Sequence, residues 1–505
     1  MAAQSILIDP ITRIEGHLSI RVQVDQGRVT SAESIGESFR GFEAILRGRK
    51  PLDAQYITQR ICGVCPVEHA IASVLAQDAA YGITPPTNGR LIRNIVAAAN
   101  FIQSNILHFY TLSAIDFIDV TAVLKYQGQD PALGYLKGWV QSELRSTNYY
   151  PAAPFLPRMN GDYAADPELN LGALRHYIQA LELRSEASKL GALLGGKLPH
   201  VASIIPGGAT IRVGGRIIAD CISLIQRLRD FIERCYIPDV LAVASAYSSY
   251  YGIGAGPGNY LAFGVFHEDA AGTNKLLPSG VLTGGVYSAL DQSRITEDVG
   301  CSWFSSGSGQ HPLSGDTTPA PDKAGAYSWI KAPRYNGHVM EVGPLARVLI
   351  AYQSGTNPAL TAQVDALLLA TGRSLGELNS VMGRHAARAV ETKIIADRCE
   401  QWLEQLTADA IGFTPFTIPS SCQGIGLTEA ARGALGHWMQ VSGGVISRYQ
   451  CVVPTTWNAS PRDDRGQPGA MEQALVGTPV ADPTSPVETV RVVRSFDPCL
   501  SCAVH

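Results

Sequence analysis

Hydrophobic and polar residues alternate along residues 17–35, and this alternation predicts an antiparallel hairpin. The turn between its two strands falls at Asp25-Gln26-Gly27. Other segments instead place apolar residues at helical spacing, and Pro85 and Pro86 separate the first two of these segments. The segments predicted to be helical are 53–82, 87–121, 167–195, 216–247 and 359–408, the last with a break near Gly372.

Three stretches lack this helical period. Residues 122–165 are rich in tyrosine, proline and glycine and are predicted to be irregular, whereas residues 250–345 are typical of loops and short strands. Residues 449–458 have the pattern of a strand. The pattern as a whole indicates an α+β fold that is predominantly helical.

The composition is that of a globular chain with extensive buried surface, since 46% of its 505 residues are hydrophobic and 17% are charged. The net charge of −4 favours neither nucleic acid nor an anionic membrane surface as a partner. The first nine residues do not resemble a signal peptide. The uncharged stretch 94–115 contains several polar side chains that a helix facing lipid would not carry, so it is predicted to be a buried core helix.

The two ends of the chain carry the same arrangement of cysteines. One stretch, near the start, is Arg60-Ile61-Cys62-Gly63-Val64-Cys65-Pro66-Val67-Glu68-His69, and the other, which ends the sequence, is Asp497-Pro498-Cys499-Leu500-Ser501-Cys502-Ala503-Val504-His505. Each Cys-x-x-Cys can present two sulfurs to one metal ion, so the two pairs together supply four thiolates. A local zinc ribbon is disfavoured because its pairs lie roughly 12 to 20 residues apart, whereas two independent redox pairs stay open as an alternative.

With these motifs the chain resembles the large subunit of nickel–iron hydrogenases over essentially its whole length. The final Ser-Cys-Ala-Val-His is similar to the nickel–iron–selenium branch, in which the position of Cys499 is a selenocysteine. The resemblance implies one large domain, residues 1–505, with a central bundle of long helices and small sheets at its periphery. It also implies that the two cysteine motifs meet at the centre of that domain.

This resemblance implies a nickel–iron centre that cleaves H2 reversibly and heterolytically into two protons and two electrons. Cys62 and Cys499 would bind nickel terminally, while Cys65 and Cys502 would bridge nickel to an iron that carries carbonyl and cyanide ligands. A second metal ion, magnesium or iron, would lie near the C-terminus. The groups that would hold it are the carboxylate of Glu43, the backbone carbonyl at Cys451 and the side chain of His505.

The resemblance also implies roles for residues around the metals, each of which would otherwise be an ordinary surface or core residue. Glu15 would pass protons to and from a nickel thiolate, and Arg432 would lie over the open side of the metals. The spacing itself, one helical turn after Cys65, indicates that His69 donates a hydrogen bond to a thiolate, with a satisfied core histidine as the alternative. The residues that would line the diatomic ligands of the iron are Val453, Pro454 and Thr455. The chain departs from the family pattern at Ser104, where many members have an aspartate, and at Ala431, where proline is usual.

The other six cysteines show no spacing that suggests a second four-thiolate site, so we expect no iron–sulfur cluster in this chain. The resemblance therefore implies a heterodimer with an iron–sulfur small subunit that receives the electrons, with H2 and protons as the small-molecule partners. It also implies that any membrane contact is indirect. A periplasmic or membrane-associated location through the small subunit is expected rather than a cytoplasmic one. The lack of a signal-peptide pattern here does not decide this, because family members that work outside the cytoplasm carry their export signal on the small subunit.

Two other functions compete with a hydrogenase. A related subunit of a respiratory complex has the fold without the metals, but such proteins have lost the four cysteines that are present here. A structural zinc protein acting as a binding module would need no match at Glu15, Arg432 or Thr455. A zinc hydrolase is disfavoured because four thiolates leave no open position for water.

Overall fold

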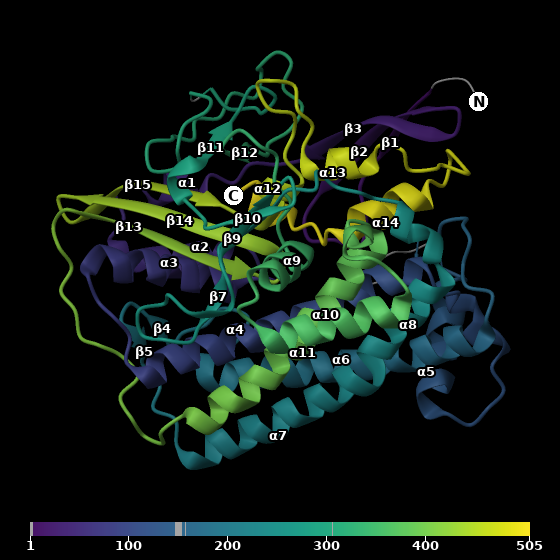
Figure 1. The fold of residues 1–505 in the computed structure, drawn as a ribbon, viewed down its shortest axis with the longest axis horizontal. Coiled ribbons are helices and arrows are strands. Elements are labelled where there is room, and N and C mark those ends of the chain that lie inside the picture. Colours follow the sequence, from purple (N-terminus) through teal and green to yellow (C-terminus); the bar gives the residue numbers. More distant parts are fainter. Residues whose placement is uncertain (1–3, 147–153, 157, 306) are drawn as a thin grey trace.

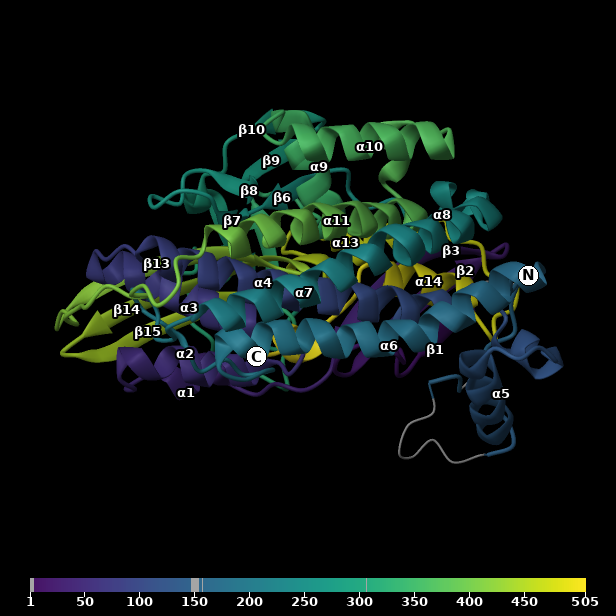
Figure 2. The ribbon, with the colours of Figure 1, turned by 90° about the horizontal axis from the view of Figure 1, so that it is seen from below.

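A bundle of long helices forms one side of the molecule (Figures 1 and 2). The computed structural model describes residues 4–146, 154–156, 158–305 and 307–505. The helices of the bundle are α4 (Thr87–Leu107), α6 (Pro167–Gly195), α7 (Gly215–Phe231), α8 (Ile237–Ala246) and α11 (Val381–Gln405). Helix α4 packs against α6 and α11, α7 packs against the same two helices, and α8 packs against α11.

The apolar period predicted most of this bundle. The segment 167–195 coincides with α6, whose first turn is stabilised by Pro167 and by the Asp166 side chain, which accepts a hydrogen bond from the backbone of Glu168. The segment 216–247 becomes α7 and α8, joined by the π-helix Ile232–Tyr236. The predicted break near Gly372 separates α10 (Pro358–Thr371) from α11. The stretch 94–115 is largely buried, as expected, but the helix predicted over 87–121 is wrong in part: α4 ends at Leu107, and the π-helix His108–Ser113 and a 3-10 turn follow it. In the described part of the chain no helix is both long and apolar enough to span a membrane.

A three-stranded antiparallel sheet lies beside the bundle, and α3 (Pro66–Tyr81) packs on its face (Figure 1). Its strands are β13 (Cys422–Ala430), β14 (Gly433–Ser442) and β15 (Val445–Val452). Helix α3 lies close to β13 because Gly424 and Gly426 have no side chains; a Cβ at either position would clash with the helix backbone.

The remaining sheets are small. Residues 17–35 form the predicted hairpin, and a further strand that the pattern did not reveal pairs with it, giving the order β1-β2-β3. The other strands form one three-stranded sheet, β10-β9-β6, and three two-stranded pairs, β4-β5, β7-β8 and β11-β12. The bounds are β1 (Gln4–Ile8), β2 (Leu18–Asp25), β3 (Arg28–Gly36), β4 (Ile204–Ile205), β5 (Gly208–Ala209), β6 (Tyr260–Ala262), β7 (Val265–His267), β8 (Lys275–Leu277), β9 (Gly280–Thr283), β10 (Val286–Ser288), β11 (Ile295–Asp298) and β12 (Ala332–Tyr335).

The shorter helices surround these sheets and the bundle. Their bounds are α1 (Phe42–Leu46), α2 (Ala54–Thr58), α5 (Pro131–Glu143), α9 (Pro344–Ser354), α12 (Pro454–Asn458), α13 (Ala470–Leu475), α14 (Val487–Ser495) and α15 (Leu500–Ala503). The architecture is therefore α+β and predominantly helical, with small sheets around a helical bundle, as predicted.

Three other predicted elements were also wrong in part. The helix expected over 53–82 is interrupted: α2 ends at Thr58, a 3-10 turn follows, and α3 begins only at Pro66. Proline suits the first turn of a helix, so residues 62–65 lie before α3 and not within it. The region 122–165 was expected to be irregular but contains α5, which starts at Pro131 and is capped by the side chain of Asp130. Within this region, residues 147–153 and 157 lie outside the described residues. The strand expected over 449–458 ends at Val452, because Pro454 starts α12.

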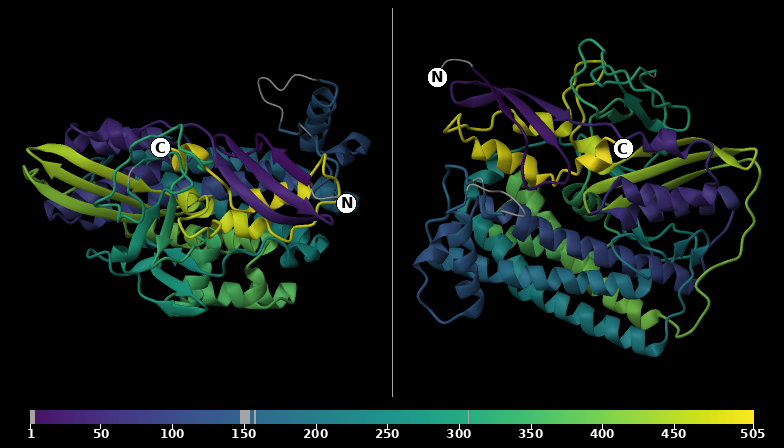
Figure 3. Two further views of the ribbon diagram at one scale, coloured as in Figure 1. Left: turned by 90° about the horizontal axis from the view of Figure 1, so that it is seen from above. Right: turned by 180° about the vertical axis from the view of Figure 1, so that it is seen from behind.

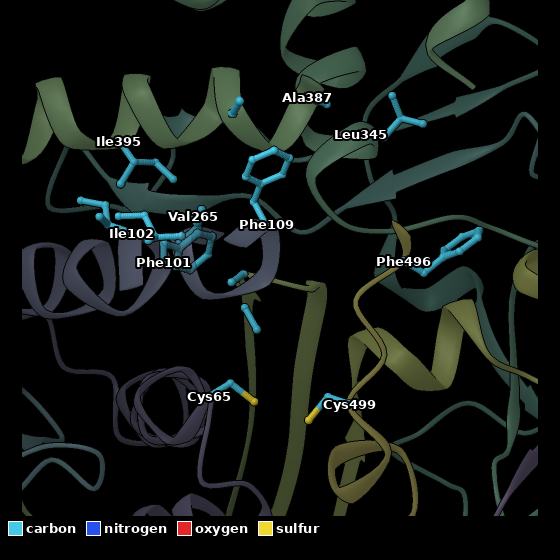
Figure 4. Packing of buried hydrophobic residues seen from close by; sticks show 14 of the residues in the cluster. Cys65, Phe101, Ile102, Phe109, Val265, Leu345, Ala387, Ile395, Phe496 and Cys499 are labelled. Atoms are coloured by element: carbon cyan, nitrogen blue, oxygen red, sulfur yellow. The ribbon is translucent and has the colours of Figure 1, made fainter. Parts of the chain in front are cut away.

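The two ends of the chain are tied together inside the molecule. Glu15 and Cys499 form an isolated parallel β-bridge, and His505 at the C-terminus is 6% exposed. Figure 3 shows the C-terminal segment among the other elements, whereas the β1-β2-β3 sheet lies at the periphery. In the buried core, Cys65 and Cys499 turn their sulfur atoms toward one another (Figure 4).

Candidate metal centre

Four cysteine sulfurs meet in one buried cluster. Cys62 and Cys65 lie in the loop before α3, and Cys499 and Cys502 lie at the start of α15 and within it. The sulfurs of Cys62 and Cys499 are 3.4 Å apart, those of Cys65 and Cys502 are 3.2 Å apart, and those of Cys499 and Cys502 are 3.0 Å apart. All four thiols are free and buried, and all four sulfurs lie within 4.8 Å of one another. This is a compact set of soft ligands for one metal centre.

The electrostatics of the cluster favour a bound cation. Hydrogen bonds from the other three thiols lower the pKa of Cys62, so one thiolate forms readily there. Burial raises the pKa of Cys499 and of Cys502 well above the ordinary value of a thiol. Four thiolates so close together would repel one another, and a soft metal ion removes that repulsion as it displaces the protons. The residues present therefore fit a metal centre.

Glu15 lies directly against this cluster. Its Oε2 atom accepts hydrogen bonds from the Cys499 thiol at 3.2 Å and from the backbone N–H of Ser501 at 3.1 Å. The backbone N–H of Leu500 also donates to the carbonyl of Glu15 at 2.7 Å. The next residue, Gly16, has φ +79°, and a Cβ there would clash with Ser501. The backbone thus fixes the carboxylate within reach of a cysteine proton.

Arg432 reaches the cluster from the turn between β13 and β14. Its Nη2 donates to Asp497 at 3.0 Å and its Nη1 donates to Ser104 at 3.4 Å. Burial alone would lower the pKa of Arg432, but Asp497 and the nearby cysteine thiolates outweigh burial and hold that pKa well above its ordinary value. Asp497 is therefore the counter-charge that the uncharged Ser104 does not provide.

The backbone beside Arg432 is held by a buried arginine. Arg347 donates through Nη2 to the carbonyl of Ala431 at 2.8 Å, and it pairs with Glu391 and Glu429. Neither Arg347 nor its two carboxylate partners has exposed side-chain surface. The absence of the usual proline at Ala431 is thus accompanied by an ion-pair network that fixes the same turn.

The residues expected near an iron ion border the cysteines. Val453 and Pro454 are buried where β15 gives way to α12. The Thr455 hydroxyl oxygen accepts a hydrogen bond from the backbone N–H of Cys499 at 2.9 Å, so its own hydrogen remains available for another acceptor.

His69 lies one helical turn after Cys65. Its Nδ1 faces Nε2 of His437 at 3.1 Å. Burial lowers the pKa of His69 to about 3, against the opposing charge of Cys62, so the ring is neutral. Sequence reasoning missed His437, because the two histidines are 368 residues apart and no local spacing connects them.

A second buried group combines Glu43, Cys451 and His505. Glu43 Oε1 accepts from the backbone N–H of Cys451 at 2.8 Å and lies 3.2 Å from Nε2 of His505. Burial opposes ionisation of Glu43, but Lys331, His505 and Thr317 outweigh it and lower the pKa of Glu43. The structure brings the N–H and the sulfur of Cys451 to this group, and the backbone carbonyl of Cys451 as a ligand stays a prediction. Lys331, which pairs with Glu43, was not anticipated.

The hydrogen bonds of His505 test whether a metal ion fits there. Its Nδ1 lies 2.5 Å from the carbonyl oxygen of Cys502, which can only accept, so Nδ1 carries a hydrogen. Nε2 of the same ring faces the Glu43 carboxylate at 3.2 Å, so a proton or a metal ion between them has a nitrogen on one side and an oxygen on the other. Oxygen and nitrogen donors suit a hard or borderline metal ion.

Three comparisons connect this geometry to known proteins. Residues 40–505 match the family model described as nickel-dependent hydrogenase, and residues 5–34 match a model described as HoxL-like. The chain is 41% identical to the periplasmic [NiFeSe] hydrogenase large subunit of Desulfomicrobium baculatum, over 99% of this chain and 94% of that protein. It is 37% identical to the Hydrogenase-1 large chain of Escherichia coli K12, over 100% and 95% of the two chains. The Ni-Fe-Se hydrogenase of Desulfovibrio vulgaris Hildenborough in its reduced state superimposes with a TM-score of 0.89 at 41% identity, covering all of both chains.

Proposed function

The chain belongs to the nickel-dependent hydrogenase family, as a large, catalytic subunit, and from that premise we propose which of its residues perform the reaction. A nickel–iron centre held by Cys62, Cys65, Cys499 and Cys502 would supply the site at which H2 binds and gives up its electrons. The convergence of the four buried sulfurs within 4.8 Å carries this proposal. All four cysteines would hold this centre through their thiolates, which suit a redox-active late metal.

The first proton leaves through Cys499 and Glu15. The Cys499 sulfur accepts the proton, and the Glu15 carboxylate removes it across their 3.2 Å contact. The N–H of Ser501 holds the same carboxylate oxygen in place. A positioned carboxylate of this kind typically contributes about 10²–10⁴-fold to a rate. Since the Desulfomicrobium and Desulfovibrio relatives compared above are [NiFeSe] hydrogenases, the cysteine at 499 is proposed to do with sulfur what selenocysteine does in that branch.

The other residues around the cluster orient charge and small ligands. Arg432 is an always-protonated cation that Asp497 and Ser104 hold beside the cluster, so it would orient charge there and would not act as a base. Val453 and Pro454 form an apolar wall, and the Thr455 hydroxyl is free to donate to a cyanide. These three residues suit an iron that carries uncharged or weakly basic diatomic ligands.

The second metal is assigned to Glu43, Cys451 and His505, with magnesium or iron as the occupant. His505 connects the two sites, because its ring bonds to the carbonyl of Cys502. The fit of a cation between the imidazole and the carboxylate supports this assignment.

The electrons are proposed to leave through an iron–sulfur small subunit in a heterodimer. Among the described residues, the groups of His, Cys, Asp and Glu side chains that could hold a metal ion are the two sites above, and both are already assigned. A periplasmic or membrane-associated location, with membrane contact through the small subunit, is proposed because the Desulfomicrobium relative is a periplasmic protein. Residues 1–505 are proposed to act as one domain, since both cysteine motifs belong to one hydrophobic core.

Metal analysis and infrared spectroscopy of the purified enzyme test this function. We expect nickel and iron in equal amounts and the infrared bands of one carbonyl and two cyanides. Cys65→Ser should lose both metals, whereas Cys301→Ser, a half-buried cysteine outside the cluster, should retain them. Zinc alone with no such bands would favour a structural zinc protein and refute the proposal.

A further inference from the structure

A ladder of polar side chains runs along the buried face of α3. His69, Ser73, Gln77 and Tyr81 recur every four residues, which places them on one side of the helix. The first three are fully or almost fully buried, and Tyr81 is half-buried at the end of the helix. This side faces the β13-β14-β15 sheet, from which His437 and Tyr449 complete the ladder.

Hydrogen bonds join the members of the ladder in two groups. In the outer group, the Tyr81 hydroxyl donates to Gln77 Oε1 at 3.2 Å, and Gln77 Nε2 donates to the Ser73 hydroxyl oxygen at 3.4 Å. The inner group begins at Tyr449. The Tyr449 hydroxyl lies 2.8 Å from Nδ1 of His437, whose Nε2 lies 3.1 Å from Nδ1 of His69.

The direction of the inner group is fixed at Tyr449. Among the described residues, the hydrogen bond of the buried Tyr449 hydroxyl is the one to Nδ1 of His437. A phenol keeps its hydrogen at neutral pH, and a buried hydroxyl hydrogen without an acceptor is costly. The Tyr449 hydroxyl therefore donates to Nδ1 of His437.

Two neutral imidazole rings, those of His437 and His69, extend the same donor-to-acceptor order from Tyr449. Burial lowers the pKa of His437 and of His69, so each ring carries one hydrogen only. Because Nδ1 of His437 accepts from Tyr449, its hydrogen is on Nε2 and is donated to Nδ1 of His69. The hydrogen of His69 is then on Nε2, the ring nitrogen that does not face His437.

We propose that His437 and Tyr449 are positioning residues that lock His69 in its Nε2–H tautomer, so that a permanent N–H donor is presented to the cysteine cluster. His69 lies one helical turn after Cys65, and the charge of Cys62 acts on its ring, where it opposes the effect of burial on the pKa of His69. An N–H donated to a thiolate withdraws electron density from the sulfur, and partners behind a histidine set which ring nitrogen can do this. Hydrogen bonds aligned in one direction also polarise one another, which strengthens the last donor.

Substitutions at His437 and Tyr449 separate this role from simple packing. His437→Gln keeps a side-chain N–H that can donate to His69, whereas His437→Leu removes the donor. Tyr449→Phe keeps the ring but removes the hydroxyl that fixes His437, and Tyr81→Phe removes only the outermost link. All four are made in the complete enzyme and compared by 15N NMR of histidine-labelled protein and by the carbonyl infrared band.

The expected result is a protonated Nε2 on His69 in the wild-type enzyme and in His437→Gln. In Tyr449→Phe and His437→Leu the hydrogen should move wholly or partly to Nδ1, and the carbonyl band should shift to lower frequency. Tyr81→Phe should shift the band least. The inference is wrong if His69 carries its hydrogen on Nδ1 in the wild-type enzyme, or if His437→Gln shifts the band as much as His437→Leu.

The infrared comparison rests on the proposed nickel–iron centre, but the NMR comparison does not. An enzyme without nickel or iron would refute the proposed function, and the position of the His69 hydrogen would still decide this inference.

Discussion

Replacing Asp497 by asparagine tests whether Arg432 depends on a counter-charge or only on a hydrogen bond. Both side chains of this ion pair are 2% exposed, and their N···O distance is 3.0 Å. Asparagine retains an oxygen that can accept from Arg432 but carries no charge. Asp497 has φ +54°, a conformation in which asparagine is also tolerated, so the substitution adds no backbone strain.

The size of the effect follows from the burial of the pair. Removing one partner of a buried ion pair costs about 3–5 kcal/mol, because the remaining charge is left uncompensated. A chain of 505 residues unfolds with an entropy of about 1 kcal/mol/K, so this cost lowers the melting temperature by about 3–5 °C. Ser104→Ala removes only the 3.4 Å contact to Arg432 and should cost about 1 kcal/mol, or about 1 °C.

Differential scanning calorimetry of the two variants beside the wild-type enzyme measures this difference. Metal content is determined on the same samples, so that loss of the metals is not mistaken for loss of the ion pair. Equal melting temperatures for Asp497→Asn and Ser104→Ala would refute the reasoning, because they would show that Asp497 contributes a hydrogen bond and not a charge.

Three further predictions follow from other sites. Glu15→Gln cannot accept a proton, so H2 oxidation should fall by about 10²–10⁴-fold with nickel content unchanged, and a loss below tenfold would contradict the relay. Burial raises the pKa of Glu68 to about 7, so the infrared band of its protonated carboxyl group should fade as the pH rises through about 7. A band that persists well above neutrality would contradict the raised pKa of about 7. Gly426→Ala would push a Cβ against the carbonyl of Ala72 and should lower the melting temperature by about 1–3 °C, whereas Gly172→Ala, in open space on α6, should not lower it.

Much of the helical bundle could be predicted from sequence because its signal is local. The apolar period of 167–195 identified α6 with the right ends, and the glycine at 372 marked a real break. The period failed where short-range rules interrupt it, as at Pro66 and Pro454, each of which starts a new helix. The helix α5 was missed because its glycines, tyrosine and proline are also the residues of irregular chain.

The ligands of the candidate site were identified from sequence because they lie in short motifs. Their partners could not be identified in this way. His437 contacts His69 across 368 residues, and Lys331 contacts Glu43 across 288 residues. Each of these side chains was an unremarkable polar residue in its own stretch, and only the folded chain gives it a role. Asp497 lies within the C-terminal motif, but its pairing with Arg432 depends on the turn between β13 and β14.

The sulfur cluster joins residues 437 positions apart, and this separation determines when during synthesis the cluster can assemble. A ribosome that adds about 5–20 residues per second needs roughly 20–90 s to make the chain between Cys62 and Cys499. Throughout that interval the first pair of thiols has no second pair to meet, and it is open to oxidation or to a competing ion such as zinc. The correct metals can be enclosed only once synthesis has passed Cys502, so delivery of nickel must be timed to the end of translation or later.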